Sequence, residues 1–512
     1  MYVQIVPVLI LLILSILLVA YTIRSLIFLF VSRNIIKSVY NRSSQGASKA
    51  AADNNFDSRI DHITSLSNKI RSISYHDIVT ANVKTEEYSQ INKKYTNVNE
   101  AFVSILIASY NESQVIGRLM KSCAALTYNQ NKFEIIVVDD SDDETLKVLD
   151  LWEKKIPNLK IIHRINRKGW KGGALNVALK NMSTKSSYVL IVDADNIIVS
   201  HTLESFVSCF KESYLRANIV DVVQGYPVPG VYNSKDKFDN NYTYSIIRCN
   251  SNWIAKAIDF RLAKRNLIEF VAKDKLNLPL QVTGSLFMIR TEVIKSIGFS
   301  EDLTEDWDLT LNIHLSPNNV LRHVDHYSHE NKQQNKPAII IGHTKVIYNP
   351  SIICYTETTT KFKAYFRQRM RVSEGHTRSF IKNIFRILTS KKATIDKVEF
   401  VFTGLQYAKF IVVLTLIAID SILLLSNGIS FAITNNFMKL SLLVQAAILS
   451  INIGISFVAT DVCKIMRNYS IKDVLYLLFL NLCTMPAFAI GSLLGLFRKE
   501  GTFYKTERNI ID

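Results

Sequence analysis

The sequence lacks the motifs of several large classes of soluble protein. Its six cysteines are widely scattered without C-x-x-C spacing, which argues against a disulfide framework or a zinc site and is typical of reduced thiols in a cytosolic body. No G-x-G-x-x-G follows the first predicted strand and no G-x-x-x-x-G-K-[ST] occurs, so a dinucleotide oxidoreductase and a P-loop hydrolase both lack their main signature. No DNA- or RNA-binding motif occurs either. The formal net charge of +17 is therefore better explained by an anionic membrane surface or a phosphorylated ligand than by nucleic acid.

Four long apolar runs predict helices that cross a membrane. The first, Val3–Thr22, holds twenty residues without a charge, enough for a hydrocarbon core of about 30 Å. No basic segment precedes it and no small-residue cleavage site follows it, which argues against a cleaved signal peptide. The basic residues after it predict an external N-terminus and a cytosolic following segment. The other runs are Val401–Leu425, Leu440–Thr460 and Val474–Phe497. An integral, multi-pass cell-membrane protein is therefore predicted.

Polarity divides the chain into six predicted regions. A transmembrane signal-anchor helix (1–32) precedes a polar cytosolic tether (33–100) that is rich in Ser, Asn and Lys. A folded cytosolic domain (101–375) comes next. The remaining regions are an interfacial segment (376–400), a C-terminal transmembrane region (401–497) with two or three crossings or a re-entrant segment, and a basic tail (498–512).

Short apolar runs alternate with helix-like stretches from Ala101 onward. The runs FVSILIA, FEIIVV, LKIIH and YVLIV are apolar on both faces, which is typical of a parallel sheet covered by helices on both sides. Ligands of such sheets bind at the carboxyl ends of the strands. These ends read SYNES, DDSDD, RINRKGWKGG and DADN, the composition expected where a cation bridges a phosphorylated ligand to carboxylates.

Asp193 and Asp195 end the fourth of these runs. Two carboxylates one residue apart repel each other and lose hydration at a strand end, so a positive charge should compensate them. Mg²⁺ or Mn²⁺ prefers such all-oxygen ligands and usually takes further oxygens from a diphosphate. A solvated turn that starts a helix at Asn196 is the alternative, and the pair alone does not decide between the two.

Two later segments favour the metal interpretation. TED places Glu305 and Asp306 together, and KAYFRQRMRVSEG places Gln368, Arg369 and Arg371 on one predicted helix. With these motifs in this order, residues 101–373 resemble the family 2 glycosyltransferases, particularly the membrane-embedded branch that includes cellulose, chitin and hyaluronan synthases. The resemblance implies an α/β GT-A fold with a Rossmann-like mixed sheet and helices on both faces. It also implies a nucleotide-sugar donor, a divalent cation and inversion at the sugar.

The resemblance also implies a role for each matching residue. Asp193 and Asp195 match the metal-binding pair, and Asp306 matches the general base that takes the acceptor's proton. The matching donor residues are Tyr110, Glu112, Asp140, Lys171, Asp193, Gln368, Arg369 and Arg371, and the implied acceptor residues are Gly284, Glu305 and Val372.

The chain departs from the family pattern at position 372. The Q-x-x-R-W motif ends in Trp, but here the residue is Val372, which removes an aromatic platform for the acceptor's terminal sugar. A lipid or another acceptor therefore becomes more plausible. In contrast, the tail GTFYKTER resembles the gating loop of processive synthases, with Phe503, Thr506 and Arg508 aligned. An ordinary basic juxtamembrane tail is the alternative.

The tail also raises a question of topology. If all three C-terminal segments cross the membrane, the tail lies outside, away from any nucleotide and against the positive-inside bias. The segment with Pro486 would then be re-entrant or interfacial, or the number of crossings would differ. Asp420 lies within a predicted span, where an interfacial position or helix pairing is favoured over a translocation path.

His323, His326 and His329 have a spacing that suggests a metal site. No flanking cysteine and no helical i, i+4 pair supports that interpretation. The segment is instead interpreted as a polar insertion.

The sequence predicts a membrane-bound hexosyltransferase that transfers a sugar, from a UDP-linked donor, to a growing polysaccharide. Transfer of one sugar to a lipid or lipid-linked acceptor is the first alternative. A catalytically silent sugar-binding scaffold is the second, although such a subunit should have lost a catalytic carboxylate, and Asp140, Asp193, Asp195 and Asp306 are all present.

Overall fold

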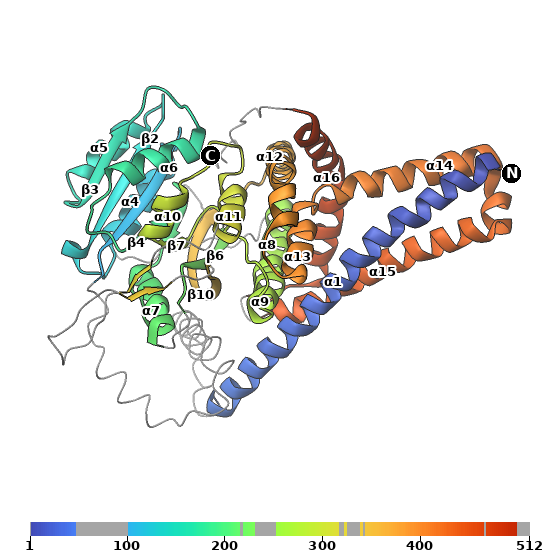
Figure 1. Cartoon of the computed structure of the whole chain (residues 1–512), viewed down its shortest axis with the longest axis horizontal. Coiled ribbons are helices and arrows are strands. Elements are labelled where there is room, and N and C mark those ends of the chain that lie inside the picture. The colour runs from blue at the N-terminus through green and yellow to red at the C-terminus, as the bar shows by residue number, and fades with distance from the viewer. Residues whose placement is uncertain are drawn as a thin grey trace. The chain divides into compact units, whose positions relative to one another are not determined.

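The computed structural model describes residues 2–47, 101–215, 219–230, 252–316, 322–324, 338–340, 344–464 and 467–498 (Figure 1). The chain divides into two compact units. The sheet unit comprises Ser74–Pro227 and Pro279–Thr356, and the helical unit comprises Met1–Ile73, Val228–Leu278 and Glu357–Asp512. The tether after residue 47, His326 and His329, and the predicted gating residues Phe503, Thr506 and Arg508 lie outside the described residues.

The sheet unit is built on an eight-stranded mixed sheet in the order β3-β2-β1-β4-β7-β6-β10-β5. The first four strands are parallel, and Leu106 of β1 lies opposite both Ile136 and Ile191. β7 then pairs antiparallel with β4 and with β6, which confirms the mixed α/β sheet. The bounds are β1 Val103–Ser109, β2 Phe133–Asp139, β3 Leu159–His163, β4 Tyr188–Ile191, β5 Asn196–Ile198, β6 Val222–Gly230, β7 Phe287–Arg290 and β10 Val346–Glu357.

Helices cover both faces of this sheet. Successive strand residues point to opposite faces, and Ile105 and Leu106 are both fully buried, so apolar side chains on both sides of β1 are removed from water. The helices of the sheet unit are α4 Ile116–Ala124, the short η2 Gln130–Lys132, α5 Thr145–Glu153, α6 Trp170–Asn181, α7 Thr202–Leu215, α10 Thr291–Ile297 and α11 Glu305–Leu315. The backbone of His323 belongs to a separate two-stranded sheet of β8 Arg322–Val324 and β9 Ala338–Ile340.

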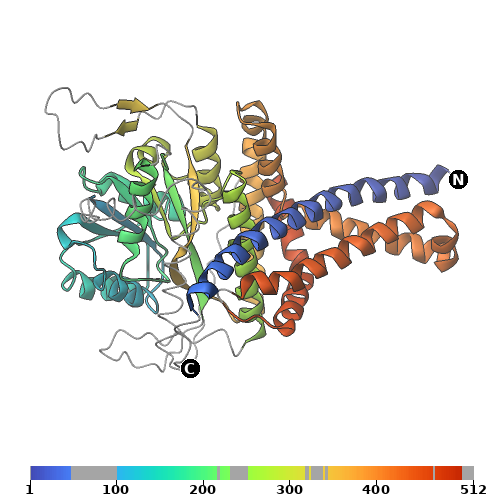
Figure 2. The ribbon, with the colours of Figure 1, turned by 90° about the horizontal axis from the view of Figure 1, so that it is seen from below.

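The helical unit contains long apolar helices together with shorter connecting ones. In both views, α1 runs beside α14 and α15 (Figures 1 and 2). Leu11, Leu416, Leu423 and Met438 form a buried apolar cluster among these three helices. The bounds are α1 Tyr2–Ala47, α8 Trp253–Lys264, the π-helix η3 Arg265–Phe270, α9 Val271–Lys275, α12 Phe362–Thr389, α13 Thr394–Gly404, α14 Lys409–Thr434, α15 Asn436–Cys463 and α16 Ile471–Phe497.

Four helices in the described part of the chain are long and apolar enough to cross a membrane. They cover Ile10–Ile36, Lys409–Gly428, Asn436–Cys463 and Ile471–Phe497. Their number agrees with the four predicted runs. Pro486 lies inside α16, which continues to Phe497.

Two predicted boundaries differ from the structure. Residues 33–47, assigned to the tether, continue α1. The run from Val401 is divided, because α13 ends at Gly404 and α14 starts at Lys409. At Gly404 any side chain would collide with the ring of Phe380, so the glycine lets α13 end in close contact with α12. The predicted interfacial segment 376–400 therefore falls on the second half of α12 and the first half of α13.

Candidate active site

The ammonium group of Lys171 lies at the centre of the candidate site in the sheet unit. It is 2.7 Å from Asp193 Oδ1 and 2.8 Å from Glu305 Oε1, and it donates a hydrogen bond of 2.9 Å to the carbonyl oxygen of Gly284. These partners follow β4, begin α11 and precede β7, respectively. One side chain from the start of α6 thus joins three separate segments.

Asp306 lies against the same group of residues. Gly284 has a φ of +76°, and a Cβ there would stand 3.4 Å from both Asp306 Cβ and Lys171 Nζ. Asp306 is in the first turn of α11, where its Oδ1 accepts the backbone N–H of Trp307 at 2.8 Å. The glycine both adopts the left-handed backbone conformation and leaves the space beside Asp306 open.

Ser285 fixes the turn that carries the Asp193–Asp195 pair. Its hydroxyl oxygen accepts the backbone N–H of Asp193 at 2.9 Å and the side-chain amide of Asn196 at 2.6 Å. Asn196 is fully buried. The turn is therefore fixed by hydrogen bonds to Ser285 and is not a solvated loop. The solvated-turn alternative therefore loses support.

Burial and neighbouring charges shift the pKa values of Lys171 and Asp193. Burial would lower the pKa of Lys171, but Asp193 and Glu305 raise it well above its usual value, so the ammonium stays protonated. Burial raises the pKa of Asp193, Lys171 opposes that rise, and the nearby Asp195 adds to it. Additional positive charge beside the two aspartates would favour their ionised forms.

The donor atoms fit a divalent cation that is shared with a ligand. Asp193 and Asp195 offer carboxylate oxygens, the type preferred by Mg²⁺ and Mn²⁺. Within the described ranges, no group of three or more His, Cys, Asp or Glu side chains could hold a metal ion. A cation at the pair would therefore need oxygens from a bound ligand or water to complete its coordination.

A second polar group forms at the ends of β2 and β3. Arg164 makes a bidentate contact with the Asp140 carboxylate, in which Nε donates to Oδ1 at 2.6 Å and Nη2 donates to Oδ2 at 2.5 Å. The same guanidinium donates to the backbone oxygens of Lys168 and Trp170, each at 3.2 Å. Arg164 thus ties the predicted nucleotide residue Asp140 to the loop that leads into Lys171.

Tyr110 and Glu112, at the end of β1, lie beside this group. The guanidinium carbon of Arg167 is 3.3 Å from the centre of the Tyr110 ring, a stacked cation–π arrangement. The backbone N–H of Glu112 donates to Thr145 Oγ1 at 2.8 Å, and that of Asn111 donates to Ser141 Oγ at 2.7 Å. The loops after β1 and β2 are therefore bonded to each other.

Gln368, Arg369, Arg371 and Val372 belong to the helical unit, where all four lie on α12. Arg369 donates to Gln368 Oε1 at 3.0 Å. Gln368 and Arg371 are three residues apart and share one face of the helix. Their part in binding a donor remains a prediction.

Several residues of the site were not predicted from the sequence. Within RINRKGWKGG a role was assigned to Lys171 alone, although Arg164 and Arg167 follow the same buried strand and their position was a usable signal. Ser285 and Asn196 carried no such signal, since a serine and an asparagine next to turns are common.

A mixed α/β sheet with paired carboxylates and a basic glycine-rich loop at its strand ends defines a nucleotide-sugar-binding domain of the GT-A class. Residues 104–295 match the model of the family described as Glycosyl transferase family 2. The chain thus contains a family 2 glycosyltransferase domain.

Curated relatives share this domain. The chain is 32% identical over 129 residues to the poly(ribitol-phosphate) beta-N-acetylglucosaminyltransferase TarS of Staphylococcus aureus, covering 25% of this chain and 22% of that protein. It is 28% identical over 220 residues to beta-monoglucosyldiacylglycerol synthase of Nostoc sp., covering 42% and 41%. It is 24% identical over 319 residues to probable glucomannan 4-beta-mannosyltransferase 10 of Arabidopsis thaliana, covering 61% and 49%. The chain thus spans less than half the length of each of these relatives.

Proposed function

We propose that the protein is an inverting, metal-dependent hexosyltransferase that moves a sugar from a nucleotide diphosphate, with UDP as the nucleotide, onto a growing polysaccharide. The contact of Lys171 with Asp193, Glu305 and Gly284 carries the proposal, because it unites the predicted donor side and acceptor side in one charged group. The four apolar helices would hold the enzyme in the cell membrane with the sheet unit in the cytosol.

The donor is held by the residues at the ends of β1, β2 and β3. Tyr110, Glu112 and Asp140 contact the base and ribose, and Arg164 keeps the Asp140 carboxylate in place. Gln368 and Arg371 steady the diphosphate. A divalent cation, when bound at Asp193 and Asp195, supplies positive charge that stabilises the departing diphosphate.

Asp306 acts on the acceptor. An acceptor hydroxyl is a poor nucleophile at neutral pH, and the Asp306 carboxylate takes its proton during attack. The hydroxyl oxygen bonds to the anomeric carbon while the bond from that carbon to the diphosphate oxygen breaks, so the configuration inverts in one displacement. Lys171 lies beside both Asp193 and the Asp306 backbone turn, where it stabilises charge that develops on the phosphate oxygens.

A lipid acceptor is the second candidate. Val372 replaces the tryptophan that would stack on a terminal sugar, and the relative in Nostoc is named as a glucosyldiacylglycerol synthase. The relatives named for poly(ribitol-phosphate) and glucomannan favour a polymeric acceptor instead.

Product analysis separates these candidates. The purified full chain in detergent would be incubated with radiolabelled UDP-sugars, Mn²⁺ and a membrane lipid extract. A ladder of water-soluble oligosaccharides supports polysaccharide synthesis, whereas a single labelled glycolipid that enters organic solvent contradicts it. No transfer to either product, together with intact nucleotide binding, would support the silent scaffold.

A further inference from the structure

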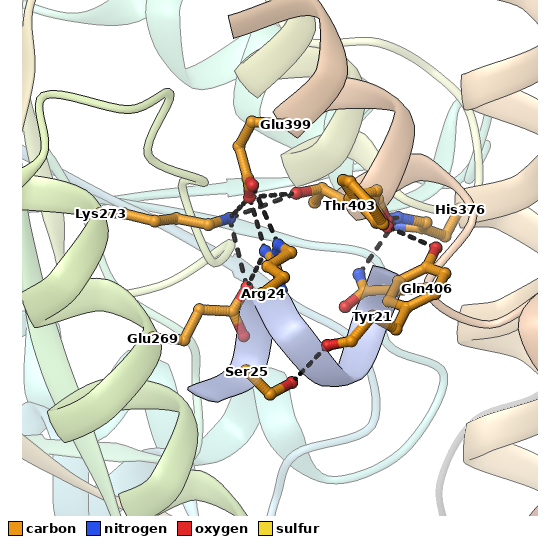
Figure 3. Close-up of polar contacts among 10 residues, drawn as sticks. Tyr21, Arg24, Ser25, Glu269, Lys273, His376, Glu399, Thr403 and Gln406 are labelled. Carbon is orange, nitrogen blue, oxygen red and sulfur yellow. Dashed lines mark hydrogen bonds and ion pairs between the residues drawn. The ribbon is translucent and has the colours of Figure 1, made fainter. Parts of the chain in front are cut away.

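Four charged side chains of the helical unit, two of them buried and two partly buried, form a closed ring of alternating sign (Figure 3). Arg24 Nη2 lies 2.8 Å from Glu269 Oε1 and 2.5 Å from Glu399 Oε1. Lys273 Nζ lies 3.2 Å from Glu269 Oε1 and 2.9 Å from Glu399 Oε1. We name Arg24, Glu269, Lys273 and Glu399 the charge ring; its members come from α1, η3, α9 and α13.

The charge ring is balanced and largely removed from water, since the side chains of Arg24 and Glu269 are 15% and 27% exposed. Two positive and two negative groups face each other, and the side chains of Lys273 and Glu399 are only 1% and 5% exposed. Burial would raise the pKa of Glu399, but Lys273 and Arg24 hold it below its usual value, so the Glu399 carboxylate stays ionised. Removal of one member would leave an uncompensated buried charge, which is far more disruptive than removal of a neutral pair.

The charge ring is bonded to α12 through Thr403 of α13. The hydroxyl of Thr403 accepts a hydrogen bond from Lys273 Nζ at 3.2 Å and donates one to Glu399 Oε1 at 3.1 Å. The carbonyl oxygen of Thr403 is 2.8 Å from Nε2 of His376 on α12. The next residue, Gly404, packs directly against Phe380 of α12.

The contact point on α12 is close to the residues predicted to bind the donor. His376 follows Arg371 by five residues in one continuous helix, a separation of about 7.5 Å along its axis. A helix transmits a shift or tilt at one turn to the next because its backbone hydrogen bonds keep it rigid. A change at the charge ring would thus displace Gln368 and Arg371.

We propose that the charge ring positions α12, so that Arg24 of α1 acts as a positioning residue for nucleotide binding although it does not touch the nucleotide. This inference rests on the proposed function, since it assumes that Gln368 and Arg371 hold the diphosphate. The N-terminal helix then has a role in setting donor affinity in addition to its role as an anchor.

The experiment compares Arg24→Gln with Thr22→Val, both in the full-length protein in detergent. Thr22 lies two residues away on the same helix and accepts a hydrogen bond from Asn452 of α15 at 2.9 Å, so its loss weakens α1 packing without touching the charge ring. UDP affinity is measured by calorimetry well below the unfolding temperature, and Tm is measured separately. Arg24→Gln should weaken UDP binding roughly tenfold, the size typical of coupling through packed elements, while Thr22→Val should lower Tm alone.

A double variant tests the charge argument directly. Arg24→Gln with Glu399→Gln removes one charge of each sign and leaves Lys273 paired with Glu269, so UDP affinity should recover toward the wild-type value. Arg24 donates to both carboxylate oxygens of Glu399, from Nε to Oε2 at 2.9 Å and from Nη2 to Oε1 at 2.5 Å. If Arg24→Gln does not fold, Arg24→Lys keeps the charge but loses this two-pronged contact, and should weaken UDP binding severalfold.

The outcomes separate the inference from the proposed function. Unchanged UDP affinity in Arg24→Lys and in Arg24→Gln, whatever their Tm, overturns the inference. A wild-type protein that binds neither UDP nor GDP overturns the proposed function instead.

Discussion

The charged groups of the two units differ in their exposure to solvent and in how they are paired. In the sheet unit, Asp193 and Asp195 follow the end of β4, Lys171 contacts Asp193, and the Asp193 side chain is 38% exposed. In the helical unit, the charge ring closes on itself and two of its members are almost fully buried (Figure 3). An open, partly exposed group is suited to bind a ligand, whereas a closed ring of paired charges is suited to hold segments together.

This difference gives two kinds of expected mutant. Changes in the open group should reduce turnover and ligand binding with little effect on stability. Changes in the charge ring should lower stability and alter binding indirectly, because a buried pair broken on one side leaves a charge without compensation.

The largest effect is expected at the predicted general base. Asp306→Asn keeps the shape of the side chain but cannot take a proton, so sugar transfer should fall by about 10²–10⁴-fold. UDP affinity should be unchanged, because Asp306 is assigned to the acceptor. Asp308→Asn is the matched control. Asp308 lies on the same helix as Asp306, and its carboxylate accepts a hydrogen bond from the Ser300 hydroxyl at 2.8 Å. Normal turnover in Asp306→Asn would remove it as the base.

A somewhat smaller loss is expected from Lys171→Met. Without the ammonium, Asp193 and Glu305 face each other without their shared partner, and the diphosphate loses a stabilising charge. Turnover should fall about 10²-fold, as for removal of one preorganised electrostatic group. Lys180→Met, at the exposed last turn of the same helix, should have near-normal turnover. Equal rates in the two variants would refute the central position of Lys171.

Arg164→Lys tests the role of Arg164, one of the site residues that were not predicted from the sequence. A lysine keeps the charge but cannot form the two-pronged contact with Asp140 or reach both loop carbonyls. UDP affinity should weaken roughly fivefold to tenfold, about 1–1.4 kcal/mol, with Tm little changed. Calorimetric titration measures the affinity for UDP. A variant that binds UDP as tightly as the wild type would show that the contact of Arg164 with Asp140 does not contribute to nucleotide binding.

The smallest effect concerns the acceptor. If the product is a polysaccharide, Val372→Trp should lower the KM for oligosaccharide acceptors about twofold to tenfold, the range expected for an aromatic platform. Val372→Leu, which adds bulk without an aromatic face, is the control. An unchanged KM for oligosaccharides, together with an unchanged KM for lipid acceptors, would place Val372 outside the acceptor path.

Local patterns in the sequence were enough to predict the parallel half of the sheet and the polar residues at its edge. The apolar runs that became β1 to β4 are continuous, and a parallel sheet fixes where their carboxyl ends lie. Asp140, Lys171 and Asp193 could therefore be assigned to one edge before any coordinates were known. The antiparallel strands β6 and β7 were not assigned, because they are separated by 56 residues and their pairing is not a local property.

The charge ring could not be predicted from the sequence either, because its contacts are also not local. Arg24 pairs with residues 245 and 375 positions away, and its place just after an apolar run was interpreted only as a signal of topology. The division at Gly404 was missed because Val401–Leu425 is apolar overall, although Gln406 and Lys409 interrupt it. The contact of Gly404 with Phe380 of α12 joins residues far apart in the sequence.

The most direct test of the proposed activity is a donor screen with and without metal. The purified full chain would be incubated with a panel of UDP- and GDP-sugars in Mg²⁺ or Mn²⁺, and again after complete removal of metal with EDTA. We predict transfer from at least one UDP-sugar that is lost with EDTA and restored by added Mn²⁺ or Mg²⁺. Full transfer after the metal has been removed would contradict the assignment of Asp193 and Asp195 as a metal site for the departing diphosphate.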